Sequence, residues 1–306
     1  MTALSGDIGN GILKILSERE DCVLFGCDVN PIAAGMNDVK HFWKCKYAVE
    51  EGYIDELLEK CKKHRITHLI PVNEKEIETV SKERRRFSQE GVKILIQSSQ
   101  ALEICLDKYC TAQWLSEKRF DVPHTYRNIK DISFKTGKKF IYKPRKSNGS
   151  RDIQMIASSE EAMQLKMDGY VLQDYIDSED EYTVGVFCSK QIINTIAFRR
   201  KLKHGYSSQI ELVKDHKLEE IAHRIAELMH LEGYINIQLR KKDGQYFIFE
   251  INPRISGTVR FRHMLGFTDV LWWLDLVDGM KIPLFKNEYQ HALGIRELNE
   301  KFLIMD

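Results

Sequence analysis

One stretch decides how this chain is interpreted: Phe247-Ile248-Phe249-Glu250-Ile251-Asn252-Pro253-Arg254. Side chains of a strand alternate between two faces, so we expect Phe247, Phe249 and Ile251 to share an apolar face. Glu250 and Asn252 then share the opposite face, although asparagine is disfavoured in strands. A carboxylate and an amide offer the hard oxygen ligands that suit Mg²⁺ beside nucleotide phosphates. The pattern predicts a metal site at these two residues, with Arg254 placed to meet a phosphate.

A second strand is expected just before it, from Tyr234 to Arg240, and Asp243-Gly244 marks a hairpin turn between the two. Polar residues alternate along this strand with apolar ones, so Asn236, Gln238 and Arg240 share a face. A three-residue turn or a bulge would place Gln238 opposite Glu250, whereas a regular hairpin with a two-residue turn would separate them. Gln238 as a third metal ligand therefore depends on the register.

A basic segment lies in the middle of the chain. The expected strand Lys139 to Pro144 carries Lys143 among apolar residues, where a buried ammonium needs an anionic partner. The loop from Arg145 to Arg151 is basic and contains Gly149, so its amides and cations are suited to closing over phosphates. The alternative is a basic surface hairpin.

Another expected strand, Tyr170 to Ile176, ends in residues whose backbone groups suit adenine recognition. The candidate nucleotide-binding residues here are Gln173, Asp174, Tyr175 and Ile176. Glu181 follows shortly after, where it is either a ribose-binding acid or a plain surface acid.

The first hundred residues alternate expected strands and helices, which predicts a parallel sheet with right-handed crossovers. The first expected strand, Thr2 to Leu4, runs into the glycine-rich segment Gly6 to Gly11. Two interpretations of that segment stay open: a tight turn that needs glycine conformations, or an anion site at a helix N-terminus. Ligands of such sheets bind at the carboxyl ends of the strands.

Composition narrows the class of protein. With 306 residues, 43% hydrophobic residues and a formal charge of +1, the chain is typical of a globular protein and carries no bulk attraction for nucleic acid or anionic membranes. Its seven cysteines are scattered without a CxxC pair, which disfavours a zinc site or a disulfide framework and fits a reducing cytoplasm. No signal peptide or membrane-spanning segment is expected.

Taken together, these segments resemble the ATP-grasp superfamily, and within it the large subunit of carbamoyl-phosphate synthase. The matching motifs occur in the same order: DK at 107–108, YKP at 142–144, LQDYI at 172–176, EYTV at 181–184, GYINIQL at 233–239 and FEINPR at 249–254. The resemblance implies an α/β domain over residues 1–100, a first ATP-grasp lobe over 101–180 and a second lobe with the metal site over 181–306. ATP would lie between the two lobes.

The resemblance also implies roles for single residues. Lys108 and Lys143 would contact ATP phosphates, and Glu181 would hold the ribose. Gln238, Glu250 and Asn252 would bind Mg²⁺, for which Mn²⁺ is an alternative. Arg254 would steady the transferred phosphoryl group, and we place Arg145 with the nucleotide-binding residues because it begins the basic loop.

The expected activity is a carboxylate–amine ligase that forms an acyl phosphate from ATP and then an amide. One alternative is a stand-alone half of a carbamoyl-phosphate-type synthase that phosphorylates bicarbonate or carbamate. A nucleotide-binding protein without turnover and, last, a nicotinamide oxidoreductase are the others. The expected partners are small-molecule carboxylates and amines, and a homodimer is the assembly that the resemblance suggests. The candidate carboxylate-binding residues are Arg199, Arg200, Arg260 and Arg262.

Overall fold

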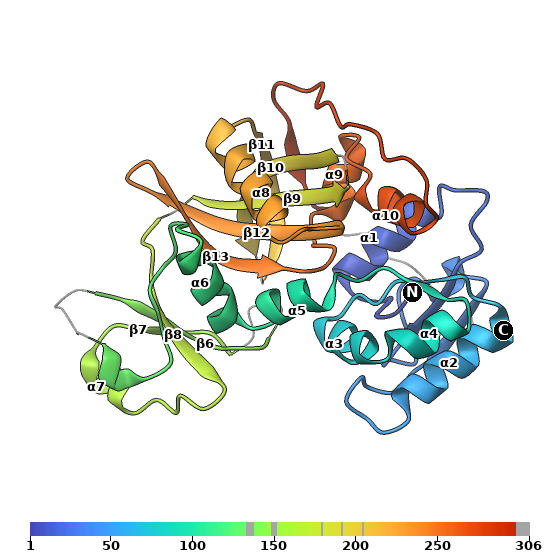
Figure 1. Ribbon diagram of the computed structural model, residues 1–306, viewed down its shortest axis with the longest axis horizontal. Helices are drawn as coiled ribbons and strands as arrows, with labels where there is room; N and C mark the ends of the chain where they lie inside the picture. The colour runs from blue at the N-terminus through green and yellow to red at the C-terminus, as the bar shows by residue number, and fades with distance from the viewer. Residues whose placement is uncertain (133–137, 148–151, 179, 191, 204, 298–306) are drawn as a thin grey trace.

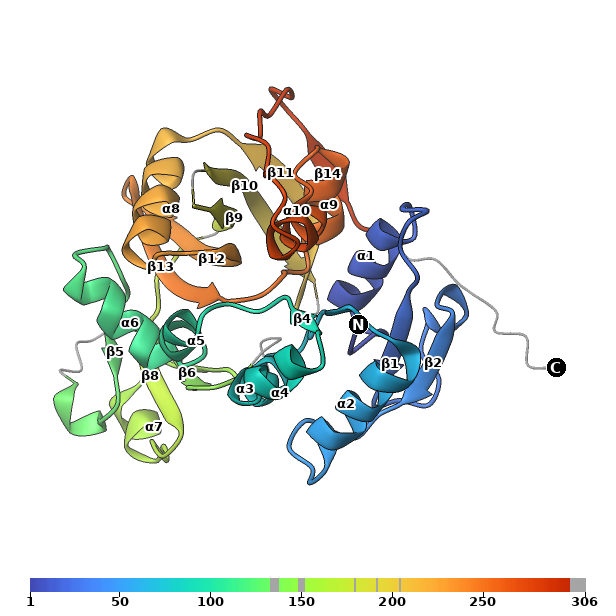
Figure 2. The ribbon, with the colours of Figure 1, turned by 45° about the vertical axis from the view of Figure 1, so that its right-hand side comes forward.

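The structure is a computed structural model that describes residues 1–132, 138–147, 152–178, 180–190, 192–203 and 205–297. Three groups of elements are visible in Figure 1: an N-terminal part at lower right, a large sheet with its helices above, and a smaller sheet at lower left. Figure 2 keeps this grouping after a rotation, with the smaller sheet and the N-terminal part on opposite sides. The predicted fold class, an α/β part followed by an α+β part, is confirmed.

The N-terminal part is built on parallel strands. Strand β1 (Phe25–Asp28) pairs in parallel with β2 (His41–Lys44), and β3 (His68–Leu69) with β4 (Lys93–Ile94). The predicted strand at Thr2–Leu4 is not a regular strand, but its amides donate to the carbonyls of Cys27 (3.2 Å, from Leu4) and Ile70 (3.1 Å, from Thr2). Residues 1–4 thus connect the two strand pairs. The helices are α1 (Asp7–Leu16), α2 (Tyr53–His64), α3 (Glu74–Lys82) and α4 (Arg84–Gln89), with a 3₁₀ turn η1 (Met36–Asp38). Helices α3 and α4 follow each other directly and are separated only by Glu83.

The glycine-rich segment does not use glycine conformations. Gly6 has φ −67° as the N-cap of α1, and neither Gly9 nor Gly11 has a positive φ. A Cβ on Gly9 would lie 2.2 Å from the Ala3 carbonyl oxygen. The glycine is needed there because α1 packs closely on residues 1–4, so the left-handed turn interpretation is wrong.

A six-stranded antiparallel sheet forms the centre of the molecule, in the order β13-β12-β9-β10-β11-β14. One face packs on α8 (His216–Leu228) and α6 (Lys108–Glu117) and the other on α9 (Val259–Met264), α10 (Asp269–Val277) and α1. Its strands are β9 (Glu181–Ser189), β10 (Ile192–Lys203), β11 (Tyr206–Val213), β12 (Gly233–Lys242), β13 (Gln245–Asn252) and β14 (Leu293–Ile295).

The smaller sheet has four strands in the order β5-β8-β6-β7. They are β5 (Thr125–Tyr126), β6 (Phe140–Pro144), β7 (Gln154–Ile156) and β8 (Tyr170–Asp174), accompanied by α7 (Ser159–Met163) and the 3₁₀ turn η2 (Ile129–Asp131). Helices α5 (Ser99–Cys105) and α6, which the sequence division places with this lobe, instead contribute Cys105 and Leu115 to the core of the six-stranded sheet. In the part of the chain that the structure describes, no helix is long and apolar enough to cross a membrane.

The hairpin of β12 and β13 settles the register question. Its turn has two residues, Asp243 and Gly244, both with positive φ (50° and 77°). A bulge between Gln238 and Leu239 then shifts the pairing, so that Gln238 lies opposite Glu250 after all.

The bulge also corrects the predicted faces of β13. Tyr246 and Ile248 are buried in the core with Ile251, whereas Phe249 lines a cavity beside Glu250. The prediction that Phe247, Phe249 and Ile251 share an apolar face is therefore wrong, because Phe249 is the extra residue and strict alternation stops there.

Candidate active site

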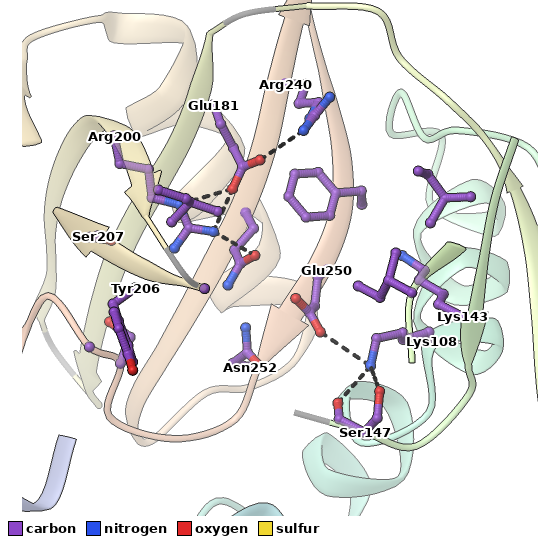
Figure 3. A pocket seen from close by; sticks show the side chains of 18 of the residues that line it. Lys108, Lys143, Ser147, Glu181, Arg200, Tyr206, Ser207, Arg240, Glu250 and Asn252 are labelled. Atoms are coloured by element: carbon purple, nitrogen blue, oxygen red, sulfur yellow. Dashed lines mark hydrogen bonds and ion pairs between the residues drawn. The ribbon is translucent and has the colours of Figure 1, made fainter. Parts of the chain in front are cut away.

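A cavity of about 750 Å³ lies where the three parts of the chain meet. Of the predicted site residues, it brings together Lys108, Lys143, Gln173, Asp174, Tyr175, Ile176, Glu181, Gln238, Glu250, Asn252 and Arg254. Figure 3 shows the side chains of β12 and β13 facing the two lysines across this cavity. We call this cavity the cleft.

Two lysines approach the cleft from different elements. Lys143, on β6, is only 4% exposed, and its Nζ donates to Gln173 Oε1 at 2.8 Å. Burial lowers the pKa of Lys143 to about 8; Glu250 opposes this shift, and Lys108 adds to it. Lys108 opens α6 directly after its N-cap, Asp107, whose side chain accepts from the Tyr109 amide.

The predicted metal ligands come from paired positions of the hairpin. Each of the three side chains has an oxygen facing a basic group. Glu250 Oε1 lies 3.3 Å from Lys108 Nζ. Gln238 Oε1 accepts from Arg200 at 2.9 Å, and Asn252 Oδ1 accepts from Arg254 at 3.5 Å. Burial opposes ionisation of Glu250, but the cations Lys108, Lys143 and Arg254 outweigh it and lower its pKa.

This donor set fits a hard divalent cation. It supplies one ionised carboxylate and two amide oxygens that already attract positive charge. No cluster of three or more His, Cys, Asp or Glu side chains suited to a metal occurs among the described residues, so a metal would also rely on the amides and on phosphate oxygens.

Arg254 is anchored by the N-terminal part of the chain. Its guanidinium lies 2.9 Å from Glu74 Oε1 at the start of α3, and it also donates to the Ile255 carbonyl. Burial raises the pKa of Glu74, opposed by Arg254. No sequence pattern predicts this pair, because Glu74 and Arg254 lie 180 positions apart and Glu74 looks like an ordinary first-turn acid.

Glu181 is held by two arginines. Its Oε1 accepts from Arg200 at 2.6 Å and its Oε2 from Arg240 at 3.1 Å, as Figure 3 shows. Arg240 also donates to the Ile176 carbonyl at 3.1 Å and lies over the Tyr175 ring. Glu181 is only 12% exposed at its side chain, so it is not the plain surface acid that the sequence left open.

Several predicted residues lie elsewhere. Arg145 does not line the cleft; it pairs with Asp107 at 2.6 Å and lies over the Tyr109 ring. Of the rest of its loop, residues 148–151 with Gly149 lie outside the described residues. Among the candidate carboxylate-binding arginines only Arg200 reaches the cleft. Arg199 and Arg260 pair with exposed acids, and Arg262 is fully buried against Asp269.

Comparison with known proteins assigns the fold. Residues 105–258, just over half of the chain, match the family model described as an ATP-grasp domain. The chain belongs to the ATP-grasp family. Residues 5–95 of this ATP-grasp protein match a second model, the PylC-like N-terminal domain.

Curated relatives of this ATP-grasp chain include the carbamoyl phosphate synthase large chain of Archaeoglobus fulgidus, 23% identical over 58% of this chain. The alignment spans 19% of that relative, so this chain matches only a fraction of its length. Similar solved structures are N5-carboxyaminoimidazole synthetase from Staphylococcus aureus (TM-score 0.71, 15% identity, covering 91% of this chain and 76% of that one) and L-amino acid ligase from Bacillus licheniformis (TM-score 0.69, 14% identity, covering 90% and 73%). At these identities the structures support the fold alone.

Proposed function

We propose that this protein is an ATP- and Mg²⁺-dependent carboxylate–amine ligase. The observation that carries the proposal is the cleft itself. It combines Lys143, which has no ion-pair partner among the described residues, with an ionised Glu250 and two amide oxygens facing it from the hairpin. Family membership and the resemblance to carbamoyl phosphate synthase support the same reaction class.

In the proposed reaction, a substrate carboxylate oxygen attacks the γ-phosphorus of ATP, and ADP leaves. An amine then attacks the carbonyl carbon of the acyl phosphate, and inorganic phosphate leaves as the amide forms. Mg²⁺ held by Gln238, Glu250 and Asn252 would neutralise phosphate charge when bound. Manganese is an alternative metal.

The protein's own part in this reaction is positioning and charge stabilisation. Lys143 and Lys108 would hold the phosphates, and the end of β8 (Gln173 to Ile176) would hold the adenine. Arg254, fixed by Glu74, would stabilise the transferred phosphoryl group. Glu181 would accept the ribose hydroxyls with its orientation set by Arg200 and Arg240.

The test is a screen for ADP and phosphate release with carboxylates and amines, alone and in pairs. We expect release that needs both substrates, and a thermal stabilisation by MgATP that NAD does not reproduce. Stabilisation by NAD and none by millimolar MgATP would overturn the proposal.

A second candidate rests on the matched relatives, which are carbamoyl phosphate synthase large chains. The chain would then act as one phosphorylating half that uses bicarbonate or carbamate. Bicarbonate-stimulated ADP release without an organic carboxylate would favour this candidate over the first.

A further inference from the structure

The charges along the cleft are almost all paired. Of the described charged side chains that line it, Lys108, Asp174, Glu181, Arg200, Arg240, Glu250 and Arg254 each take part in an ion pair. Two do not: Lys143 and Asp7. Since an unpaired charge in a cleft is stabilised by a ligand of the opposite sign, these two side chains indicate the charges that the bound substrates carry.

Lys143 is accounted for by the phosphates of ATP. Asp7 belongs to another region of the cleft, lined by the N-terminal part of the chain. The lining of the cleft here includes Gly6 and Ile8 on either side of Asp7 in the chain, Asn73 before α3, and Ser256 with Gly257 after β13, of which Gly257 lies beside the Asp7 carboxylate. We call this region the distal end of the cleft.

One oxygen of Asp7 is used locally, and the other is not. Oδ1 accepts from the amide of the next residue, Ile8, at 2.8 Å in the first turn of α1. Oδ2 has no hydrogen-bond or ion-pair partner among the described residues. The local contact therefore occupies only one oxygen of the carboxylate.

The space beside Oδ2 is kept open by a glycine. A Cβ on Gly257 would lie 2.6 Å from Asp7 Oδ2, which is closer than real Cβ contacts. The φ of Gly257 is not positive, so its backbone conformation does not require glycine. The missing side chain leaves the carboxylate reachable from the cleft.

We propose that the distal end of the cleft binds the amine substrate in its ammonium form, with Asp7 as the counter-ion; the bound group gives up one proton to water before its neutral form attacks the acyl phosphate. Tyr206 and Ser207 also line the cleft, and their hydroxyl groups would accept further hydrogen bonds from an ammonium group. This inference rests on the proposed ligase function and specifies its second substrate as an amino compound that is cationic at neutral pH.

The experiment measures KM for a stimulating amino compound and KM for ATP in the ADP-release assay, for the wild type and Asp7→Asn. Asparagine keeps an acceptor oxygen for the Ile8 amide, so α1 can begin as before, but the charge is lost. Asp55→Asn is the matched control, because Asp55 is also a first-turn acid of a helix in the N-terminal part but lies away from the cleft.

In Asp7→Asn, KM for the amino compound should rise at least about tenfold, since a charge-assisted hydrogen bond is lost, while KM for ATP changes less than about twofold. Gly257→Ala should raise the same KM by crowding Oδ2. Asp55→Asn should match the wild type.

An unchanged KM for the amino compound in Asp7→Asn would overturn this inference and leave the ligase proposal standing. If no amino compound stimulates turnover, thermal shifts with the same compounds in the presence of MgADP decide. A shift by MgADP without any further shift by amino compounds also overturns it. The absence of both shifts would instead count against the proposed function.

Discussion

Two networks of charge lie on the six-stranded sheet, and both contain an arginine paired with a carboxylate. In the cleft, Arg254 pairs with Glu74, and the side chain of the nearby Glu250 remains 21% exposed. Behind the cleft, Arg262 pairs with Asp269 at 2.6 Å, and both side chains are completely buried.

The partners of Arg262 are all internal. It donates to Ser256 Oγ (2.7 Å) and Thr258 Oγ1 (2.6 Å) and lies over the Tyr234 ring. The hydroxyl of Tyr234 is also within 3.2 Å of Ser256 Oγ. The difference shows that the same ion pair serves two purposes. The sealed pair fixes the loop after β13, whereas we expect the cleft pairs to exchange partners when phosphates bind.

The largest expected effect separates the two networks most clearly. Glu250→Gln keeps size and one ligand oxygen but removes the charge that attracts a metal. We expect phosphoryl transfer to fall by about three orders of magnitude or more, because metal-assisted charge stabilisation is lost. The melting temperature should change little. Near-normal ADP production by a folded variant would remove Glu250 from the catalytic site.

The opposite pattern is expected for Arg262→Met. This change leaves Asp269 without its partner in the core. Burial already raises the pKa of Asp269, and Arg262 opposes that rise. Breaking one side of a buried pair costs about 3–5 kcal/mol, which urea denaturation measures. The double variant Arg262→Met with Asp269→Leu should recover part of that stability. A single variant as stable as the wild type would show that the sealed network is dispensable.

Arg254 offers an intermediate case. Arg254→Lys keeps the charge but cannot contact Glu74 and a phosphoryl group with the same fork of donors. We expect kcat to fall about 10- to 100-fold with a small change in stability. Glu74→Gln should show a weaker form of the same defect, because the arginine remains but loses its anchor. Equal activity of Arg254→Lys and the wild type would make Arg254 a simple counter-ion.

The smallest expected effect is on nucleotide affinity. Only protonated Lys143 attracts phosphate, and its pKa of about 8 in the free protein means that this charge is lost as pH rises through 8. Binding above this pH must include uptake of a proton, so the Kd for ATP should rise about tenfold between pH 7 and pH 9. Calorimetry at several pH values measures this. Lys143→Met should bind weakly at both values, without the pH dependence.

The residues that line the cleft could be predicted from the sequence more readily than the ion pairs and hydrogen bonds between them. The motifs around Lys143, Glu181 and Glu250 were visible because polar residues interrupt apolar strands. The alternation of polar and apolar residues along β12 correctly predicts that Ile235, Ile237 and Leu239 face the core, where they are buried. It failed at Phe249, since a bulge is a local exception to the period on which the argument depends.

Interactions between residues far apart in the sequence could not be predicted, for a different reason. Nothing in the local pattern of Glu74, Asp7 or Asp269 distinguishes it from other acids near helix starts. Glu74 meets Arg254, and Asp7 meets Gly257, only when the N-terminal part packs against the chain that follows β13. Asp269 pairs with Arg262 only seven positions away, across the turn between α9 and α10. Strand β14 and the helices α5, α7 and α9 were also not predicted, because they are short and weakly periodic.

The bulge in the hairpin has a consequence for changes in chain length. Because the pairing shifts there, Leu239–Ile248 and Gln238–Glu250 are successive pairs and Phe249 has no cross-strand partner. Deletion of Phe249 would therefore leave each of these pairs intact and produce an ordinary alternating strand. What the protein would lose is the ring that lies 5.8 Å from Lys143 Nζ. A natural deletion at this position would therefore keep the strand register but remove the aromatic ring beside Lys143. A gap here in a sequence alignment would not mean that the metal-binding motif is lost.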